Sequence, residues 1–172
     1  MYRLKNMNFT HIKRVAARAF ALIWLTALLC GCGEGGGAPA PFSKYFNMDV
    51  GGKPFEAQVA VDDFEKMRGL MDRRELGENS AMIFVYDQPQ RVSFWMKDTL
   101  IPLDLALFTS DGTLREIKPL YPNNLNPVNS ARADIKYCIE TNAGWFEKNG
   151  IAIGAKLSTD KLEAAIKARE KK

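Results

Sequence analysis

The stretch Ala81–Phe108, AMIFVYDQPQRVSFWMKDTLIPLDLALF, decides the fold. It holds short runs of β-branched, aromatic and other apolar residues, separated by turn-forming residues such as Gln88-Pro89. Short apolar runs bounded by turn-forming residues are typical of β-strands, and the close spacing of these runs argues against a doubly wound fold. The strands predicted from Ala81 onward are Met82–Tyr86, Arg91–Met96, Leu103–Phe108, Leu114–Lys118 and Ile135–Thr141.

A β-hairpin and a short helix are predicted ahead of this stretch. Gly51-Gly52 separates the runs Tyr45–Val50 and Phe55–Val61, and glycine accepts the positive φ angles that tight hairpin turns require. A helix is expected next, capped by Asp62 or Asp63. The residues placed on its apolar face by their spacing are Phe64, Met67 and Met71.

The C-terminal part is expected to alternate irregular and regular segments. The Pro/Asn-rich stretch Leu120–Ala131 is predicted to be a long loop, and a helical turn is expected near Ala143–Asn149. Ile151–Leu157 is predicted as a last strand and Ser158–Lys172 as a terminal helix. The sequence thus predicts a mainly β, β-rich α+β fold: a compact antiparallel sandwich or partly open barrel with short helices and a C-terminal helix.

The N-terminal 43 residues have the layout of an export signal followed by a tether. Residues 1–18 are basic, and the run Ala19–Leu29 (AFALIWLTALL) carries no charge. As a helix this run would span roughly 16 Å, against about 30 Å of hydrocarbon, which favours a signal peptide over a permanent span. The predicted order is a signal peptide at 1–31, a lipidated Cys32 with a flexible tether at 32–43, a β-rich domain at 44–157 and a C-terminal helix or tail at 158–172.

Leu29-Cys30-Gly31-Cys32 resembles the lipobox of bacterial lipoproteins. The resemblance implies that Cys32 becomes the first residue of the mature chain and is acylated through its sulfur. Two or three acyl chains would then hold the protein on a membrane. Because Gly33 is not the aspartate of an inner-membrane retention signal, the implied location is the outer membrane, facing the periplasm, in a cell with two membranes. A soluble secreted protein cleaved near the same place is the alternative.

Charge and histidine content exclude several classes of function. Five of the 24 Lys and Arg residues precede Cys32, whereas all 20 Asp and Glu residues follow it. The part of the chain after Cys32 therefore has 19 basic and 20 acidic residues. No basic stripe is left for nucleic acid. The only histidine, His11, lies in the leader, which leaves none for a catalytic dyad or metal site after cleavage. No cofactor or metal is therefore expected.

Four motifs occur in a set order along the chain. They are Arg68-Gly69-Leu70-Met71, Phe94-Trp95-Met96-Lys97-Asp98-Thr99, Pro102-Leu103-Asp104 and Glu140-Thr141-Asn142-Ala143-Gly144. Together they resemble the family called domain of unknown function 192, over about Phe55 to Leu157. The resemblance implies a compact, mainly antiparallel β fold, often behind an export signal, and it implies no established activity.

Arg68, Trp95, Lys97 and Asp104 form the candidate ligand site. Strand alternation places Trp95 and Lys97 on one face, where they and Asp104 would orient a sugar or a short polar ligand. Arg68 would present its guanidinium to an anionic group. The leading hypothesis is a small non-catalytic binding module for a polar cell-envelope ligand. The competing interpretation is structural: Trp95 fills the core, Lys97 pairs with Asp98 or Asp104, and Arg68 pairs with a carboxylate such as Glu140.

Two other classes of function remain open. Asp98, Asp104 and Glu140 supply carboxylates that a hydrolase acting on envelope glycan would use in a pair. An envelope assembly or scaffold protein would meet its partner through the long loop and the terminal helix. Cys138 has no histidine to generate its thiolate and is expected to be a small buried apolar group. The methionines expected to pack in the core are Met67, Met71, Met82 and Met96.

Overall fold

Residues 38–170 are described by a computed structural model of the chain. The predicted signal peptide and the lipidation of Cys32 fall outside these residues and stay predictions. The strands are β1 (Phe46–Val50), β2 (Lys53–Ala60), β3 (Ser80–Gln90), β4 (Ser93–Phe94), β5 (Leu103–Phe108), β6 (Leu114–Leu120), β7 (Val128–Asn129) and β8 (Ile135–Asn142). The helices are α2 (Asp63–Arg68), α3 (Trp145–Lys148) and α4 (Thr159–Arg169).

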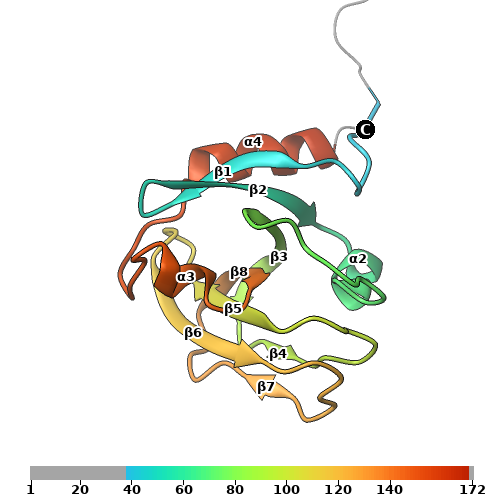
Figure 1. The fold of residues 1–172 in the computed structure, drawn as a ribbon. Coiled ribbons are helices and arrows are strands. Elements are labelled where there is room, and N and C mark those ends of the chain that lie inside the picture. Colours follow the sequence, from blue (N-terminus) through green and yellow to red (C-terminus); the bar gives the residue numbers. More distant parts are fainter. Residues whose placement is uncertain (1–37, 171–172) are drawn as a thin grey trace, which may run out of the picture. The chain divides into compact units, whose positions relative to one another are not determined.

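A six-stranded sheet with the order β1-β2-β3-β8-β5-β6 forms the body of the domain (Figure 1). Its strand pairs are antiparallel except β2 with β3, which run parallel. A small sheet of β4 and β7 accompanies it. This arrangement, without barrel closure, confirms the prediction of a β-rich α+β fold with short helices and a C-terminal helix. Between residues 38 and 170, no helix has the length and apolarity needed to cross a membrane.

The predicted hairpin is confirmed. Gly51 and Gly52 have φ angles of 57° and 76° and connect β1 to β2, with Val50 opposite Lys53. Two successive positive φ angles define the type I′ turn, whose twist matches that of the flanking strands. The glycine pair therefore fixes the register of the first two strands.

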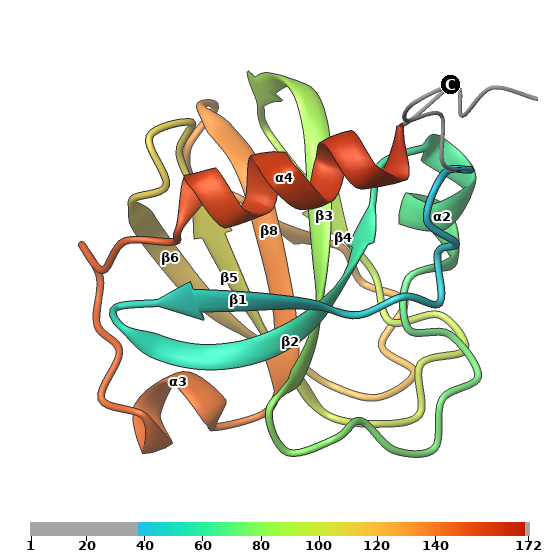
Figure 2. The same cartoon turned by 90° about the horizontal axis from the view of Figure 1, so that it is seen from above.

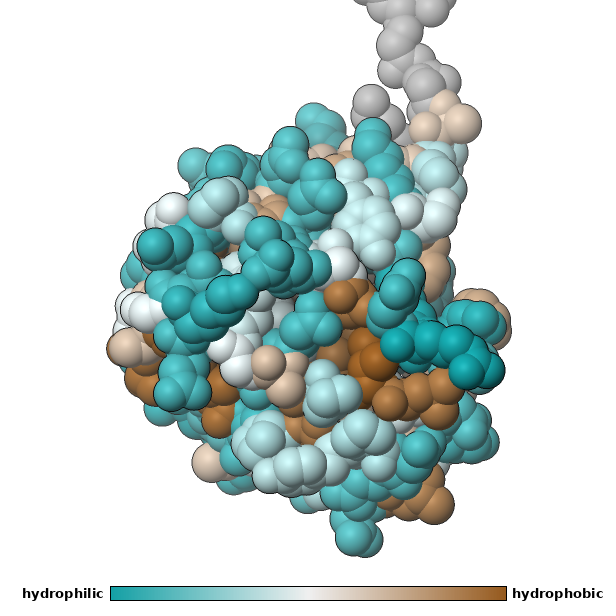
Figure 3. Space-filling model, in the orientation of Figure 1, coloured by the Kyte–Doolittle hydropathy of each residue, from teal (hydrophilic) through white to brown (hydrophobic). Residues whose placement is uncertain are grey.

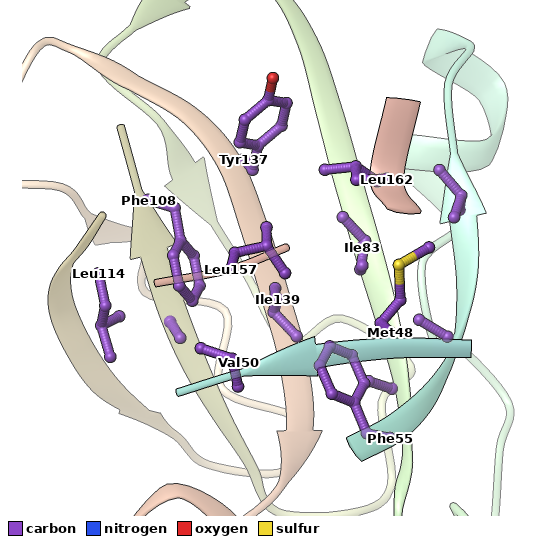
Figure 4. Packing of buried hydrophobic residues seen from close by; sticks show 14 of the residues in the cluster. Met48, Val50, Phe55, Ile83, Phe108, Leu114, Tyr137, Ile139, Leu157 and Leu162 are labelled. Carbon is purple, nitrogen blue, oxygen red and sulfur yellow. The ribbon is translucent and has the colours of Figure 1, made fainter. Parts of the chain in front are cut away.

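The central strands are buried on both faces, which explains their nearly continuous apolar sequences. Along β3, Ile83 belongs to a core cluster on one face, while Met82 and Phe84 belong to a second cluster on the other. Figure 4 shows the first cluster, in which Ile83 and Ile139 from neighbouring strands face Leu162 of α4. Such two-sided burial produces apolar runs in place of a simple polar–apolar alternation.

The terminal helix docks against the sheet. Leu162 and Ala165 of α4 are buried, and the helix crosses the domain above β1 in Figure 2. The chain before β1 is attached to the end of this helix, because the Ala40 N–H donates to the Ala168 carbonyl at 2.8 Å. Residues from Ala40 onward, assigned to the tether by the sequence, are thus bound to the domain.

Three local predictions of secondary structure are wrong. Ile151–Leu157 is not a strand: Gly154, with φ at 95°, bends the chain, and the segment makes only isolated bridges through Lys156 and Leu157. Gln88-Pro89 is not a turn but part of β3, where a register shift between Val85 and Gln90 accommodates the proline. The predicted loop Leu120–Ala131 contains β7, which pairs with β4.

The predicted apolar face of the first helix is also wrong. Phe64 and Met67 are 67% and 62% exposed, and Glu65 is the residue of α2 that is buried. The helix has only six residues, so one buried position sets which side faces the protein. Core packing is confirmed for Met82 and Met96 but not for Met67.

Candidate ligand-binding site

A cavity of about 230 Å³ lies where the end of α2 and the turn after it face β3, β4 and β8. Its lining combines charged, aromatic and apolar groups. The side chains that define its chemistry are Lys66, Arg68, Phe84, Tyr86, Trp95 and Glu140. Figure 3 shows hydrophobic residues gathered on this face of the molecule beside the position of α2, with hydrophilic residues around them.

A capping box starts the helix that forms one wall. The Glu65 N–H donates to Asp62 Oδ1 at 2.8 Å, and Glu65 Oε2 accepts from the Asp62 and Val61 N–H groups at 3.5 and 2.9 Å. These contacts satisfy donors that a helix start leaves free. The predicted cap at Asp62 is confirmed.

Gly69 ends α2 and directs the chain into the cavity wall. Its φ of 47° and ψ of −130° are open to glycine but strained for residues with a Cβ, and its N–H donates to the Glu65 carbonyl at 2.9 Å. An added Cβ would also touch the Phe84 ring at 3.5 Å. The glycine therefore places exposed Arg68 and buried Leu70 on opposite sides of one bend.

An ion pair between Arg169 and Glu65 attaches α2 to α4. The two side chains are 7% and 9% exposed, and Arg169 also donates to the carbonyls of Ala40 and Val59 and stacks over Phe42. Each partner of a buried pair needs such additional hydrogen bonds to offset its desolvation. The position of the cavity wall therefore depends on the C-terminal residue of α4.

Glu140 lies at the floor of the cavity without a partner. It is 5% exposed, and its carboxyl makes no hydrogen bond or ion pair with any residue from 38 to 170. In that range, every side-chain nitrogen or oxygen that is sealed from solvent makes a hydrogen bond. The unbonded carboxyl oxygens are therefore open to the cavity.

Burial raises the pKa of Glu140 to about 8, and nearby Arg73 only partly offsets this effect. The Arg73 guanidinium itself is engaged by Gln58 and the Tyr45 hydroxyl. With this pKa the Glu140 carboxyl is mostly protonated at pH 7 and can donate a hydrogen bond. Burial, with smaller contributions from Cys138, Glu140 and Asp63, also raises the pKa of neighbouring Tyr86.

Arg68 is exposed at the cavity, and its guanidinium makes no ion pair or hydrogen bond with residues 38–170. The alternative in which Arg68 pairs with Glu140 is thus not observed. Lys66, by contrast, is occupied: its ammonium lies 3.2 Å from Asp63 Oδ1, donates to the Val85 carbonyl at 3.3 Å and stands 5.5 Å from the Tyr86 ring centre. Arg68 is consequently the cation of this cavity that is available to a ligand.

Trp95 forms part of the cavity rim and is 49% exposed. The Lys97 ammonium lies 5.7 Å from the centre of its ring, and the alternate residues Phe94 and Met96 are buried. Strand alternation therefore predicted correctly that Trp95 and Lys97 share a face. The interpretation in which Trp95 fills the core is wrong.

Asp104 does not lie at this cavity. It pairs in register with Thr141 while Leu105 pairs with Glu140, so Asp104 and Glu140 point to opposite faces of the sheet. Asp104 Oδ2 accepts the Gly144 N–H at 2.8 Å, and burial raises its pKa while that hydrogen bond lowers it. Asp98 is exposed outside the cavity lining. The structure thus brings together Arg68 and Trp95, with Lys97 beside the latter, and leaves Asp104 apart.

Tyr86 and Lys66 line the cavity but are not among the candidate residues predicted from the sequence. The sequence predicted Glu140 only as a catalytic acid or an ion-pair partner. The available signal was an acid inside an otherwise apolar strand, since such a group needs compensation when buried. Cys138, on the same strand, is a buried free thiol whose pKa is raised by burial, as expected. Within residues 38–170, no cluster of three metal-ligating side chains occurs.

The fold and this cavity define a small β-rich domain with a buried acid beneath an arginine and a tryptophan. The chain belongs to the domain of unknown function 192 family, described as uncharacterized ACR, whose model matches residues 46–159. The resemblance in the sequence motifs is thereby confirmed. No curated protein matches the chain.

Several chains of solved structures are similar to this one, among them the following two. A proposed transcription regulator from Sinorhizobium meliloti 1021 is 30% identical, with a TM-score of 0.62 over 67% of this chain and 95% of its own. A protein of unknown function from Novosphingobium aromaticivorans DSM 12444 is 31% identical, with a TM-score of 0.64 over 71% and 93%.

Proposed function

We propose that this protein is a non-catalytic binding module that holds a small polar cell-envelope ligand in the cavity beside α2. The observation that carries the proposal is the unpartnered carboxyl of Glu140 at the cavity floor. Burying a polar group without a hydrogen bond costs on the order of 1–3 kcal/mol, which a stability-driven core would avoid with an apolar residue. A ligand that bonds the carboxyl accounts for its presence.

The rim of the cavity supports the same proposal. The Arg68 guanidinium has no partner among the described residues, and Trp95 exposes half of its surface beside it. Exposed aromatic and arginine side chains at a concave site are the groups that most often dominate binding energy. Their position above Glu140 gives the cavity charged, aromatic and hydrogen-bonding contacts within one small volume.

A hydrolase that uses two carboxylates is less well supported. Glu140 is the carboxylate among the lining residues, whereas Asp104 faces the other side of the sheet. A glycosidase needs its two carboxyl groups on either side of one bond, about 5–10 Å apart across open space. The scaffold alternative keeps one supporting observation, the exposure of Tyr121 and Leu125 in the segment around β7.

The cellular location is part of the proposal and rests on the sequence of the leader. We place the protein in the cell envelope, anchored by lipid on Cys32 and facing the periplasm of a cell with two membranes. Mass measurement of the protein isolated from its host tests this placement. A chain that begins at Cys32 with added acyl mass is expected, and an unmodified Cys32 or another first residue would reject the anchor.

A thermal-shift screen of cell-envelope fragments, followed by titration of each hit, tests the binding function. Hits are expected to bind at least tenfold more weakly to Arg68→Ala and Trp95→Ala. The matched controls are Arg74→Ala and Tyr121→Ala, which change an exposed arginine and an exposed aromatic outside the cavity. Hits that bind both cavity variants as well as the unchanged protein, or a screen without hits, would contradict the proposal.

A further inference from the structure

We propose that the ligand is a sugar acid, a hydroxylated ring that carries one carboxylate, with the carboxylate on Arg68, the ring against Trp95 and a ring oxygen or hydroxyl on Glu140. This inference rests on the proposed function and specifies the ligand class for the same cavity. Each of the three contacts has its own structural basis.

The charge at the cavity favours a single negative charge on the ligand. Arg68 is available, whereas Lys66 already contacts Asp63 and the Val85 carbonyl. A guanidinium binds a carboxylate through two parallel hydrogen bonds. Lys97 lies over the Trp95 ring and outside the lining, so Arg68 is the available cation among the residues that line the cavity. A dianionic phosphate would call for more than one such cation, and a carboxylate therefore fits better. A positively charged ligand would be repelled by the same arginine.

The size and the aromatic wall favour one hydroxylated ring. The cavity volume of about 230 Å³ lies below the roughly 300–1,000 Å³ that is typical of sites for drug-sized molecules. Trp95 offers a half-exposed indole, an apolar surface with a polar edge. A monosaccharide has the matching character, since its C–H faces are apolar and its edges carry hydroxyl groups.

Glu140 suits an uncharged oxygen better than an ammonium group. It is buried, has no partner among residues 38–170 and is held mostly protonated at pH 7 by a pKa of about 8. A protonated carboxyl has one O–H donor and can still accept, which matches a hydroxyl or ring oxygen. An ammonium ligand would require Glu140 to ionise in an apolar surrounding formed by Phe84 and Leu70.

Titration of the full-length chain in detergent with D-glucuronate, D-glucose and D-glucosamine at pH 6.5 tests the ligand class. Glucuronate is expected to bind at least tenfold more tightly than glucose, and glucosamine more weakly than either. Arg68→Ala is expected to remove the preference for glucuronate over glucose, and Arg74→Ala to keep it. Preference for glucosamine, or equal affinity for all three sugars, would overturn the inference.

Two substitutions of Glu140 separate a neutral donor from an anion. Glu140→Gln keeps a donor and an acceptor without charge and is expected to bind glucuronate within threefold of the unchanged protein. Glu140→Leu is expected to bind it at least tenfold more weakly while remaining folded in a thermal unfolding scan. If Glu140→Gln loses binding as fully as Glu140→Leu, Glu140 acts as an anion and the inference is wrong.

The outcomes also distinguish this inference from the proposed function. A neutral or cationic envelope fragment that depends on Arg68 or Trp95 would leave the binding module intact and reject the sugar acid. Absence of any fragment that depends on these side chains would reject both.

Discussion

The buried carboxyl of Glu140 predicts a specific dependence of stability on pH. The pKa of this group is about 8 in the folded chain, against an ordinary value of 4.5. Between these two values the folded state keeps a proton that the unfolded state has released, so the free energy of unfolding decreases as the pH rises. The contribution is most favourable below pH 4.5 and is lost by the time the pH passes 8.

The magnitude follows from the difference between the two values. Each pH unit within the window costs about 1.4 kcal/mol, which amounts to about 5 kcal/mol across it. Glu140→Gln removes the titrating group and keeps the size of the side chain. The unfolding free energy of this variant, minus that of the unchanged protein, is therefore expected to increase by about 1.4 kcal/mol per unit from pH 5 to pH 7 and to level off above pH 8.

Urea denaturation at pH 5, 6, 7, 8 and 9 measures this difference. Cys138→Ala is the matched control, because Cys138 lies on the same face of β8 and is equally buried. Its destabilisation is expected to be constant between pH 5 and pH 8, since burial keeps the thiol protonated there. A difference between Glu140→Gln and the unchanged protein that does not vary with pH would refute the account of a buried, unpartnered acid.

Two further substitutions test the support of the cavity, and a labelling experiment tests the burial of Cys138. Arg169→Ala is expected to lower the free energy of unfolding by about 3–5 kcal/mol, because it leaves Glu65 buried without its cation, and Glu65→Leu in the same chain should recover part of the loss in urea denaturation. Gly69→Ala should cost about 1–3 kcal/mol through its positive φ, measured in the same way, and an unchanged stability would contradict the strain. In a chain with Cys30 and Cys32 replaced by Ser, Cys138 should react with a thiol reagent only at the rate of unfolding, and rapid labelling of the folded chain would show that it is accessible.

Elements governed by local chemistry could be predicted from the sequence. The hairpin at Gly51-Gly52 follows from two residues that accept positive φ, and the cap at Asp62 follows from an acid three residues ahead of Glu65. The bounds of Leu103–Phe108 agree with β5 because an apolar run between turn signals limits a strand at both ends. The common face of Trp95 and Lys97 follows from the period of two along a strand.

The assembly of the site depends on contacts between residues far apart in the sequence. Whether Asp104 or Leu105 lies opposite Glu140 is decided by the register of β5 on β8, and a shift of one residue would have put Asp104 beside Glu140. The exposure of Phe64 and Met67 has a similar origin, since Glu65 of α2 is drawn inward by Arg169, 104 residues later. Neither contact has a local signal in the chain.

The same contacts connect the predicted anchor with the proposed site. Arg169 donates to the Ala40 carbonyl and pairs with Glu65, and Glu65 caps the helix that ends at Arg68. The segment that leads back toward Cys32 therefore contacts the domain beside the helix that forms the cavity wall, as Figure 2 shows for the start of the described chain next to α2. If Cys32 bears lipid, two contacts, Ala40 with Arg169 and Arg169 with Glu65, and one turn of α2 separate the attachment of the tether from Arg68. Arg169 contacts both the tether, at Ala40, and α2, at Glu65. Arg169→Ala is therefore expected to weaken ligand binding as well as to lower the free energy of unfolding. Unchanged ligand affinity in the folded variant would show that the attachment of the tether does not influence the cavity.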